Sequence, residues 1–199
     1  PSDGGATGSA DKASQATLGG GGVAPMAFGY AEWPFTTARV QLSTKASTSA
    51  IYPYRAAGKL FIKNAYGTGW CSAALIGKGL LVTAAHCVAN FGEGFMPGTT
   101  WTYYPGLYNG KSAYGYAAAQ KIYAMTSYLN GSDGCTLDAP GVVCVNDVAV
   151  IVLTSKRGRY IGSRTGWLGW AYGGWGFTSA GETQITQLGY PGGIDYGNQ

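Results

Sequence analysis

Charged side chains are scarce in this sequence of 199 residues, because Asp, Glu, Lys and Arg together make up only 11% of it. An average domain contains about a quarter. Hydrophobic residues nevertheless amount to 46%, so a core can form and a disordered polyelectrolyte is excluded. The sequence has no run of about 18 consecutive apolar residues, and we therefore expect no transmembrane helix and no membrane partner.

The net charge is small as well, at +4 from 13 basic and 9 acidic residues. The basic residues are scattered except for one cluster, Lys156-Arg157-Gly158-Arg159, which is typical of a solvent-exposed turn or of a loop sensitive to processing. A protein that binds nucleic acid concentrates its positive charge on one face or stripe. No nucleic-acid partner is therefore expected.

Residues that bind metals are few, since the sequence contains a single histidine and four cysteines. No Cys-x-x-Cys motif occurs, and a zinc cage would need all four thiolates at an unusual spacing. We therefore predict neither a metal nor another cofactor. Four cysteines allow three disulfide pairings, and their spacing favours Cys71 with Cys87 and Cys135 with Cys144. Two structural disulfides indicate an oxidising compartment, secreted or periplasmic, and we expect a secreted protein.

The N-terminal residues are rich in Gly, Ser, Thr and Ala. This composition indicates that residues 1–34 are a flexible segment or the remnant of a propeptide. They lack the basic region followed by an apolar one that marks a signal peptide. We therefore expect a chain that has already been processed or was produced without its leader.

Glycine is abundant, with 34 residues, and Tyr alone contributes 15. The glycines follow no three-residue period, which excludes collagen, while Gly, Tyr, Val and Thr suit tight turns and pleated strands. No segment longer than about ten residues carries a 3.6-residue apolar stripe. Many short strands between turns predict an all-β barrel or sandwich. We expect strands at residues 35–40, 59–63, 70–76, 80–83, 100–104, 117–125, 148–153 and 183–190.

The only histidine, His86, lies in the segment Thr83-Ala84-Ala85-His86-Cys87. An isolated histidine at the end of a strand is most often buried and hydrogen-bonded, but a match of five residues rarely arises by chance. The segment resembles the general-base motif of trypsin- and chymotrypsin-like serine proteases. This resemblance implies that His86 is the catalytic base and that Cys87 is bridged to Cys71 on the preceding strand.

A histidine base needs a carboxylate that fixes its tautomer and stabilises the imidazolium formed during the reaction. Among the nine acidic residues, only Asp147 leads directly into an apolar strand, Val148–Leu153. This arrangement resembles the motif of the same family that carries the orienting acid, and it implies that role for Asp147. The alternative is an ordinary turn aspartate before a strand. The Cys135–Cys144 bridge would stiffen the loop just upstream.

The nucleophile motif of the family, Gly-x-Ser-Gly-Gly, does not occur in the sequence. Ser132 lies in a similar segment, but it has Asn130 two positions before it and precedes Asp147, which is the wrong order. The segment Gly189-Tyr190-Pro191 resembles a turn in the bacterial glutamyl-endopeptidase-like branch of the family. The resemblance thus implies a chain that lacks the C-terminal segment with the catalytic serine.

The resemblance also implies an all-β, chymotrypsin-like double β-barrel. The first barrel, at residues 35–155, would be complete and would carry both His86 and Asp147. The second barrel would only begin at residues 156–199. Cleavage specificity is not predicted, because a preference for glutamate usually depends on a second histidine that this sequence does not contain.

The expected function is that of the N-terminal part of a secreted serine endopeptidase, inactive as this chain alone. The serine would lie on a C-terminal fragment of the same precursor that stays bound after a nick; a truncated chain and a pseudoenzyme are the alternatives to a nick. That fragment and a protein or peptide substrate are the expected partners. The alternative function is a catalytically inactive, protease-like binding or adhesion module. It would use aromatic side chains that otherwise fill the barrel core and rim: Trp101, Tyr103, Tyr104, Tyr108, Tyr114 and Tyr116.

Overall fold

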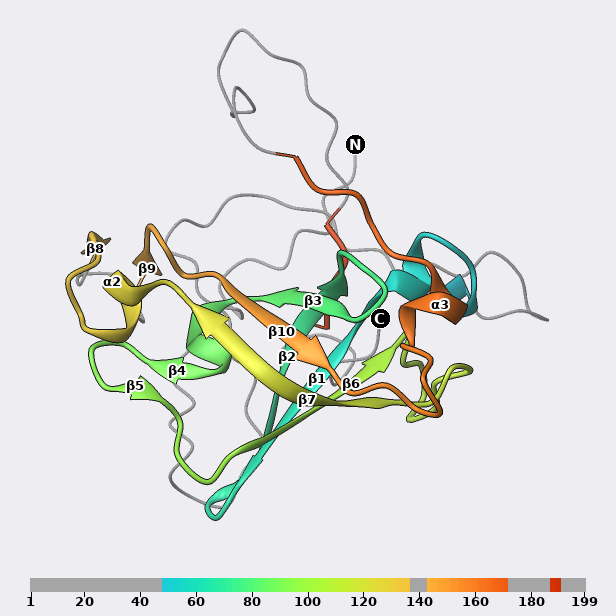
Figure 1. Ribbon diagram of the computed structural model, residues 1–199, viewed down its shortest axis with the longest axis horizontal. Coiled ribbons are helices and arrows are strands. Elements are labelled where there is room, and N and C mark those ends of the chain that lie inside the picture. The colour runs from blue at the N-terminus through green and yellow to red at the C-terminus, as the bar shows by residue number, and fades with distance from the viewer. Residues whose placement is uncertain (1–47, 137–142, 172–186, 191–199) are drawn as a thin grey trace, which may run out of the picture.

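Six antiparallel strands close into one barrel in the order β1-β2-β3-β10-β7-β6 (Figure 1). This computed structural model describes residues 48–136, 143–171 and 187–190. The closed barrel leaves none of the six strands as an edge, which removes unpaired backbone groups that would otherwise invite aggregation. The strands are β1 (Ala57–Asn64), β2 (Gly67–Leu75), β3 (Leu80–Thr83), β6 (Thr100–Pro105), β7 (Ala117–Ala124) and β10 (Ala149–Leu153).

Alternating side chains fill the barrel, because successive residues of a strand point to opposite faces. On β10 the buried positions are Ala149, Ile151 and Leu153, with half-buried residues between them. Tyr103 of β6 is fully buried, and its hydroxyl donates to the carbonyl oxygen of Ala56 at 2.9 Å, which satisfies its polar end. A Cβ at Gly58 would lie 2.5 Å from the Tyr103 ring, so this contact requires glycine.

The structure confirms six of the expected strands, with boundaries that differ by up to three residues. A barrel is formed rather than a sandwich, and it is complete, as predicted for the first barrel. The expected strand at 35–40 and most of the one at 183–190 lie outside the described residues. Residues 187–190 are described and form no strand.

Several elements too short to give a periodic pattern were not predicted. Figure 1 shows α2, β8 and β9 together at one end of the barrel. The short helices are η1 (Thr48–Ala50), η2 (Tyr54–Ala56), η3 (Ala85–Cys87), α2 (Thr126–Leu129) and α3 (Gly162–Thr165). The short strand pairs are β4 (Ala89–Asn90) with β5 (Gly94–Phe95), and β8 (Cys135–Thr136) with β9 (Val143–Cys144).

The described chain beyond Leu153 is hydrogen-bonded to strand β2 of the barrel at two points. The backbone N–H of Leu168 donates to the carbonyl of Leu75 at 2.8 Å, and that of Tyr190 donates to the Ser72 hydroxyl at 2.8 Å. In 154–171 and 187–190 no named strand is present, consistent with a second barrel that is only begun. Across the described residues no helix has the length and apolar character needed to cross a membrane.

The aromatic side chains proposed above as a binding surface are mostly not available for one. Trp101 and Tyr103 are 8% and 0% exposed, so both fill the barrel core and neither can form part of a binding surface. Tyr104, Tyr108 and Tyr114 are half-buried, and only Tyr116, at 65%, is widely exposed. The burial of Trp101 and Tyr103 follows from the alternation of β6, on which both point into the barrel core.

Candidate active site

His86 and Asp147 meet although 61 positions separate them in the sequence. Nδ1 of His86 lies 2.6 Å from Oδ2 of Asp147, and the backbone N–H of His86 donates to Oδ1 at 2.8 Å. One carboxylate oxygen thus holds the imidazole and the other holds the backbone that carries it. This double contact fixes the orientation of the ring and selects the tautomer with a proton on Nδ1.

Both side chains are partly shielded from water, with exposed fractions of 14% for His86 and 19% for Asp147. Burial by itself raises the pKa of the Asp147 carboxyl. The hydrogen bond from the His86 side chain, the charge of His86 and the backbone N–H groups of His86 and Ala85 outweigh burial, so the pKa is lowered overall. Asp147 is therefore an anion at neutral pH, able to stabilise positive charge on the neighbouring imidazole.

The turn that carries His86 is fastened to the barrel by two independent connections. The Cys71–Cys87 disulfide joins β2 to η3, and the indole N–H of Trp101 donates to the carbonyl oxygen of Cys87 at 2.8 Å. Ala85 is fully buried, which anchors the other side of His86. The histidine is therefore presented from a rigid turn rather than from a free loop.

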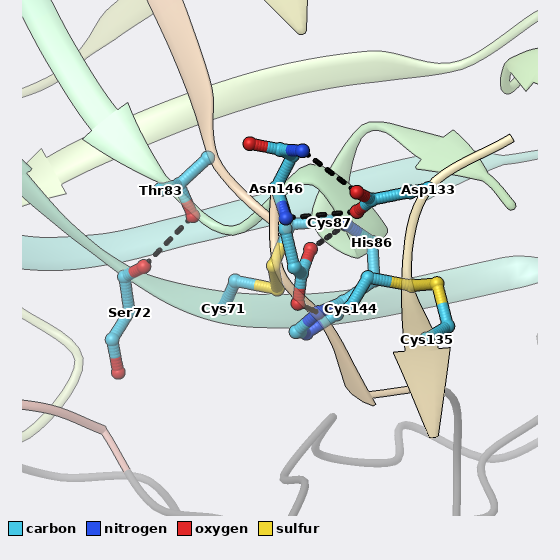
Figure 2. Close-up of polar contacts among 10 residues, drawn as sticks. Cys71, Ser72, Thr83, His86, Cys87, Asp133, Cys135, Cys144 and Asn146 are labelled. Atoms are coloured by element: carbon cyan, nitrogen blue, oxygen red, sulfur yellow. Dashed lines mark hydrogen bonds and ion pairs between the residues drawn. A yellow bond between two sulfur atoms is a disulfide. The ribbon is translucent and has the colours of Figure 1, made fainter. Parts of the chain in front are cut away.

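The residue before Asp147 is held by a second acid. The backbone N–H of Asn146 donates to Oδ2 of Asp133 at 2.8 Å, and its side-chain amide donates to Oδ1 at 2.7 Å, as Figure 2 shows. The Cys135–Cys144 disulfide closes the same loop, and Val145 N–H donates to the carbonyl of Gly134 at 3.0 Å. Asp133 and this disulfide together fix the path of the chain into Asp147.

Tyr128 packs beneath this loop and is only 2% exposed. Its ring meets that of Phe91 edge to face, with centroids 5.5 Å apart. Burial, together with the charges of Asp147 and Asp133, raises the pKa of the Tyr128 hydroxyl. The phenol thus stays neutral beside the two carboxylates and adds no third negative charge.

Four residues of this arrangement were not predicted: Trp101, Tyr128, Asp133 and Asn146. The inward position of Trp101 follows from alternation on β6, but its bond to Cys87 does not. A signal for Asp133 was available, because it lies next to a loop that a Cys135–Cys144 bridge would close. The structure does bring together the two predicted site residues, His86 and Asp147, and it contains both favoured disulfides.

Removing the Asp133 carboxylate should loosen the loop before Asp147. We expect Asp133→Ala to lower the free energy of unfolding by about 1–3 kcal/mol, because the partly buried Asn146 loses charge-assisted hydrogen bonds. Urea titration measures the loss. Ser132→Ala is the matched control, since the exposed Ser132 hydroxyl bonds only to Asn130 among the residues that the structure describes, and it should change stability by less than about 0.5 kcal/mol. Equal effects of the two substitutions would contradict the role of Asp133.

The lowered pKa of Asp147 also predicts how stability depends on pH. A carboxyl whose pKa is lower in the folded state stabilises the fold above its unfolded pKa, and this contribution disappears as the pH falls through the folded value. The stability difference between the wild type and Asp147→Asn should therefore be full above about pH 5 and shrink as the pH drops below about 4. Urea unfolding of both proteins at a series of pH values, from neutral pH to well below about 4, checks it. A difference independent of pH would show that Asp147 is not ionised in the contact.

The described residues near His86 do not fit a metal centre. Two groups of potential ligand atoms are close enough together, namely Cys71 with His86 and Cys87, and Asp133 with Cys135 and Cys144. In both groups the two cysteine sulfurs are bonded to each other, whereas a metal requires thiolates. In the first group Nδ1 of His86 is already engaged by Asp147.

Comparison with known proteins agrees with this geometry. The sequence profile of the family described as Trypsin matches residues 43–188. Because the match covers more than half of the chain and includes both His86 and Asp147, the chain belongs to the trypsin family.

A curated relative is the "Extracellular metalloprotease" of Bacillus subtilis (strain 168), 30% identical over 129 residues. The aligned region is 57% of this chain and 41% of the relative, so the chain spans less than half of that protein's length.

Two solved structures are similar to part of the chain. Protease Anisep from Arthrobacter nicotinovorans is 24% identical with a TM-score of 0.49, over 60% of this chain and 51% of that one. A Glu endopeptidase in complex with MPD is 22% identical with a TM-score of 0.43, over 62% and 49% of the two chains. Similarity at this level adds no evidence on function.

Proposed function

We propose that this chain supplies the general base and the orienting acid of a serine endopeptidase, His86 and Asp147. The observation that carries the proposal is the double contact of Asp147, at 2.6 Å to Nδ1 and at 2.8 Å to the backbone N–H of His86. A histidine held in this way is a base whose Nε2 is the ring atom that exchanges protons with the reacting groups. Membership of the trypsin family supports peptide bonds as the substrate.

The proposed reaction proceeds by acyl transfer. A serine hydroxyl attacks the carbonyl carbon of the scissile bond while His86 Nε2 takes its proton, and the carbonyl oxygen becomes the oxyanion of a tetrahedral intermediate. The intermediate collapses, the C–N bond breaks, and the imidazolium returns the proton to the leaving amine. Water then repeats the sequence on the acyl-enzyme and restores the serine. Asp147 stays ionised throughout and stabilises the imidazolium.

The nucleophile and the oxyanion-binding groups belong, in this proposal, to a further segment of the same precursor. The absence of Gly-x-Ser-Gly-Gly from the 199 residues supports this assignment, as does the fraction of the curated relative that the chain spans. We also propose that the protein is secreted, with a protein or peptide as its substrate. The two disulfides support secretion because they persist in oxidising compartments.

Inhibitors distinguish a serine peptidase from a metallopeptidase when they are applied to the complete protein. The protein carrying this sequence, with the C-terminal segment of its precursor, should hydrolyse a fluorogenic protein substrate. A fluorophosphonate should abolish the hydrolysis, because it reacts covalently with the activated serine, whereas a chelator of divalent ions should leave the rate unchanged. Loss of activity with the chelator alone would contradict the proposal and favour the chemistry in the curated relative's name.

A further inference from the structure

A concave basic site lies at the end of the barrel where β10 stops. The basic pocket, as we name it, has a volume of about 640 Å³, and four cations line it: Lys156, Arg157, Arg159 and Arg164. All four side chains are exposed. The rings of Tyr114 and Tyr116 form part of the wall. A volume of this size accommodates a small ligand or a few side chains of a larger one.

The charge of the basic pocket is unbalanced. Four of the 13 basic residues of the chain fall within positions 156–164 and line one pocket. Among the described residues none of these four cations has an ion-pair partner, and no described acid lines the site. Like charges that gather in one concavity repel one another, and a bound anion relieves the repulsion.

The lining is also held in place before any ligand binds. Nη1 of Arg164 donates to the carbonyl oxygen of Tyr114 at 3.3 Å, and its guanidinium lies 5.7 Å from the centre of that ring. A second guanidinium, that of Arg55, lies 5.8 Å from the same centre and is tied to the carbonyl of Thr165 through Nε at 2.7 Å. Tyr114 therefore links Arg164 to Arg55 of η2.

The other three cations project from one tight turn. Lys156 and Arg159 exchange two backbone hydrogen bonds, of 3.0 and 3.1 Å. The turn between them places Arg157 at φ 53° and Gly158 at φ 75°. Glycine or asparagine suits the first of these positions better than arginine does. Arg157 thus occupies a backbone angle that favours other residues, and strained positions of this kind cluster at ligand sites.

The basic pocket is separate from the proposed active site. Asp147 lies just before β10, and most of the pocket lining, from Thr154 to Arg164, follows that strand. A strand of five residues spans about 17 Å. Figure 1 shows the same separation, with α2, β8 and β9 at one end of the molecule and α3 at the other. A ligand in the pocket would not touch His86.

We propose that the basic pocket binds an acidic segment of a polypeptide through its carboxylates. Guanidinium groups, of which the pocket has three, match the planar carboxylate with paired hydrogen bonds. The tyrosine walls can pack against the methylene groups of glutamate side chains. A nucleic acid is disfavoured because the positive charge is confined to one pocket and does not extend along a face. This binding does not depend on the proposed peptidase activity.

Binding of a labelled hexaglutamate peptide, followed by fluorescence polarisation, tests the proposal. The protein is the complete chain with its C-terminal segment and with His86→Ala, so that no cleavage interferes. Hexaglutamate should bind, its affinity should fall as salt is added, and hexaglutamine should not bind. Arg157→Gln with Arg159→Gln should weaken binding about tenfold, since two ion pairs are lost.

The matched control removes the same charge elsewhere on the barrel. Lys63 and Lys121 are exposed residues of β1 and β7 that do not line the pocket, and Lys63→Gln with Lys121→Gln should leave the affinity within about twofold. Thermal unfolding confirms that both double variants are folded. Equal weakening by the two pairs would overturn the pocket as the site. Tighter binding of a single-stranded oligonucleotide of equal charge at the same salt concentration would overturn the peptide assignment.

Discussion

Replacing Asp147 with Asn is expected to lower kcat of the complete enzyme by about 10⁴-fold with little change in the fold. This magnitude is the one known for the matching substitution in another member of the trypsin family. The physical reason is the 2.6 Å contact with Nδ1. An asparagine amide that donates to Nδ1 selects the opposite tautomer, so Nε2 carries the proton and cannot accept one from the serine.

Steady-state kinetics on a peptide substrate measure the loss, which should appear in kcat more than in KM because in the proposed mechanism Asp147 acts on His86 and not on the substrate. Glu93→Gln is the control, since Glu93 is an exposed acid whose Oε2 accepts a hydrogen bond from Asn90 at 2.9 Å. It should leave kcat unchanged. A variant Asp147→Asn that keeps more than about a tenth of the wild-type kcat would show that the carboxylate does not orient the base.

Removing the Cys71–Cys87 disulfide should be the most destabilising change among those considered. The bridge joins residues 16 positions apart. Without it the unfolded chain gains conformational entropy, which lowers the free energy of unfolding by about 3 kcal/mol for a loop of that length. Both sulfurs are in the core, where Cys71 and Cys87 are 4% and 2% exposed. The double variant Cys71→Ser with Cys87→Ser also buries two hydroxyls, which adds to the loss. Guanidinium unfolding monitored by tryptophan fluorescence measures it.

The second disulfide provides the comparison. Cys135 and Cys144 are nine positions apart and only half-buried, so Cys135→Ser with Cys144→Ser should cost less stability than loss of the first bridge. The two double variants should therefore unfold in that order. The reverse order would mean that the barrel does not depend on the link between β2 and the histidine turn.

The barrel strands were predictable because their signal is local. Buried and less buried residues alternate along β6 and β10, and this alternation can be seen within a few neighbouring positions of the sequence. The glycines at 77 and 79 mark the turn between β2 and β3. The short elements η3, α2, β8 and β9 were not predictable, since two to four residues carry no period. Aromatic content alone left two interpretations open for Trp101 and Tyr103, a binding surface or the barrel core, and the structure places both in the core.

The site was predictable only in part. His86 and Asp147 were found through a motif resemblance, which names the residues but gives none of their contacts. The hydrogen bond from the His86 backbone to Asp147 joins residues 61 positions apart. The hydrogen bond from the Asn146 backbone to Asp133 joins residues 13 positions apart. Such contacts follow from how the barrel brings its end loops together. The lowered pKa of Asp147 depends on those contacts and could not be predicted without them.

The most direct test of the claim that His86 is the general base is to replace this histidine, the only one in the sequence, with alanine. Fluorophosphonate labelling of the complete protein, followed by mass spectrometry, reports whether a serine is activated by a base. We predict rapid labelling of one serine outside these 199 residues in the wild type and labelling slowed by at least about 10³-fold in His86→Ala, with both proteins folded by circular dichroism. Equal labelling of the wild type and His86→Ala would contradict the claim that His86 is the general base.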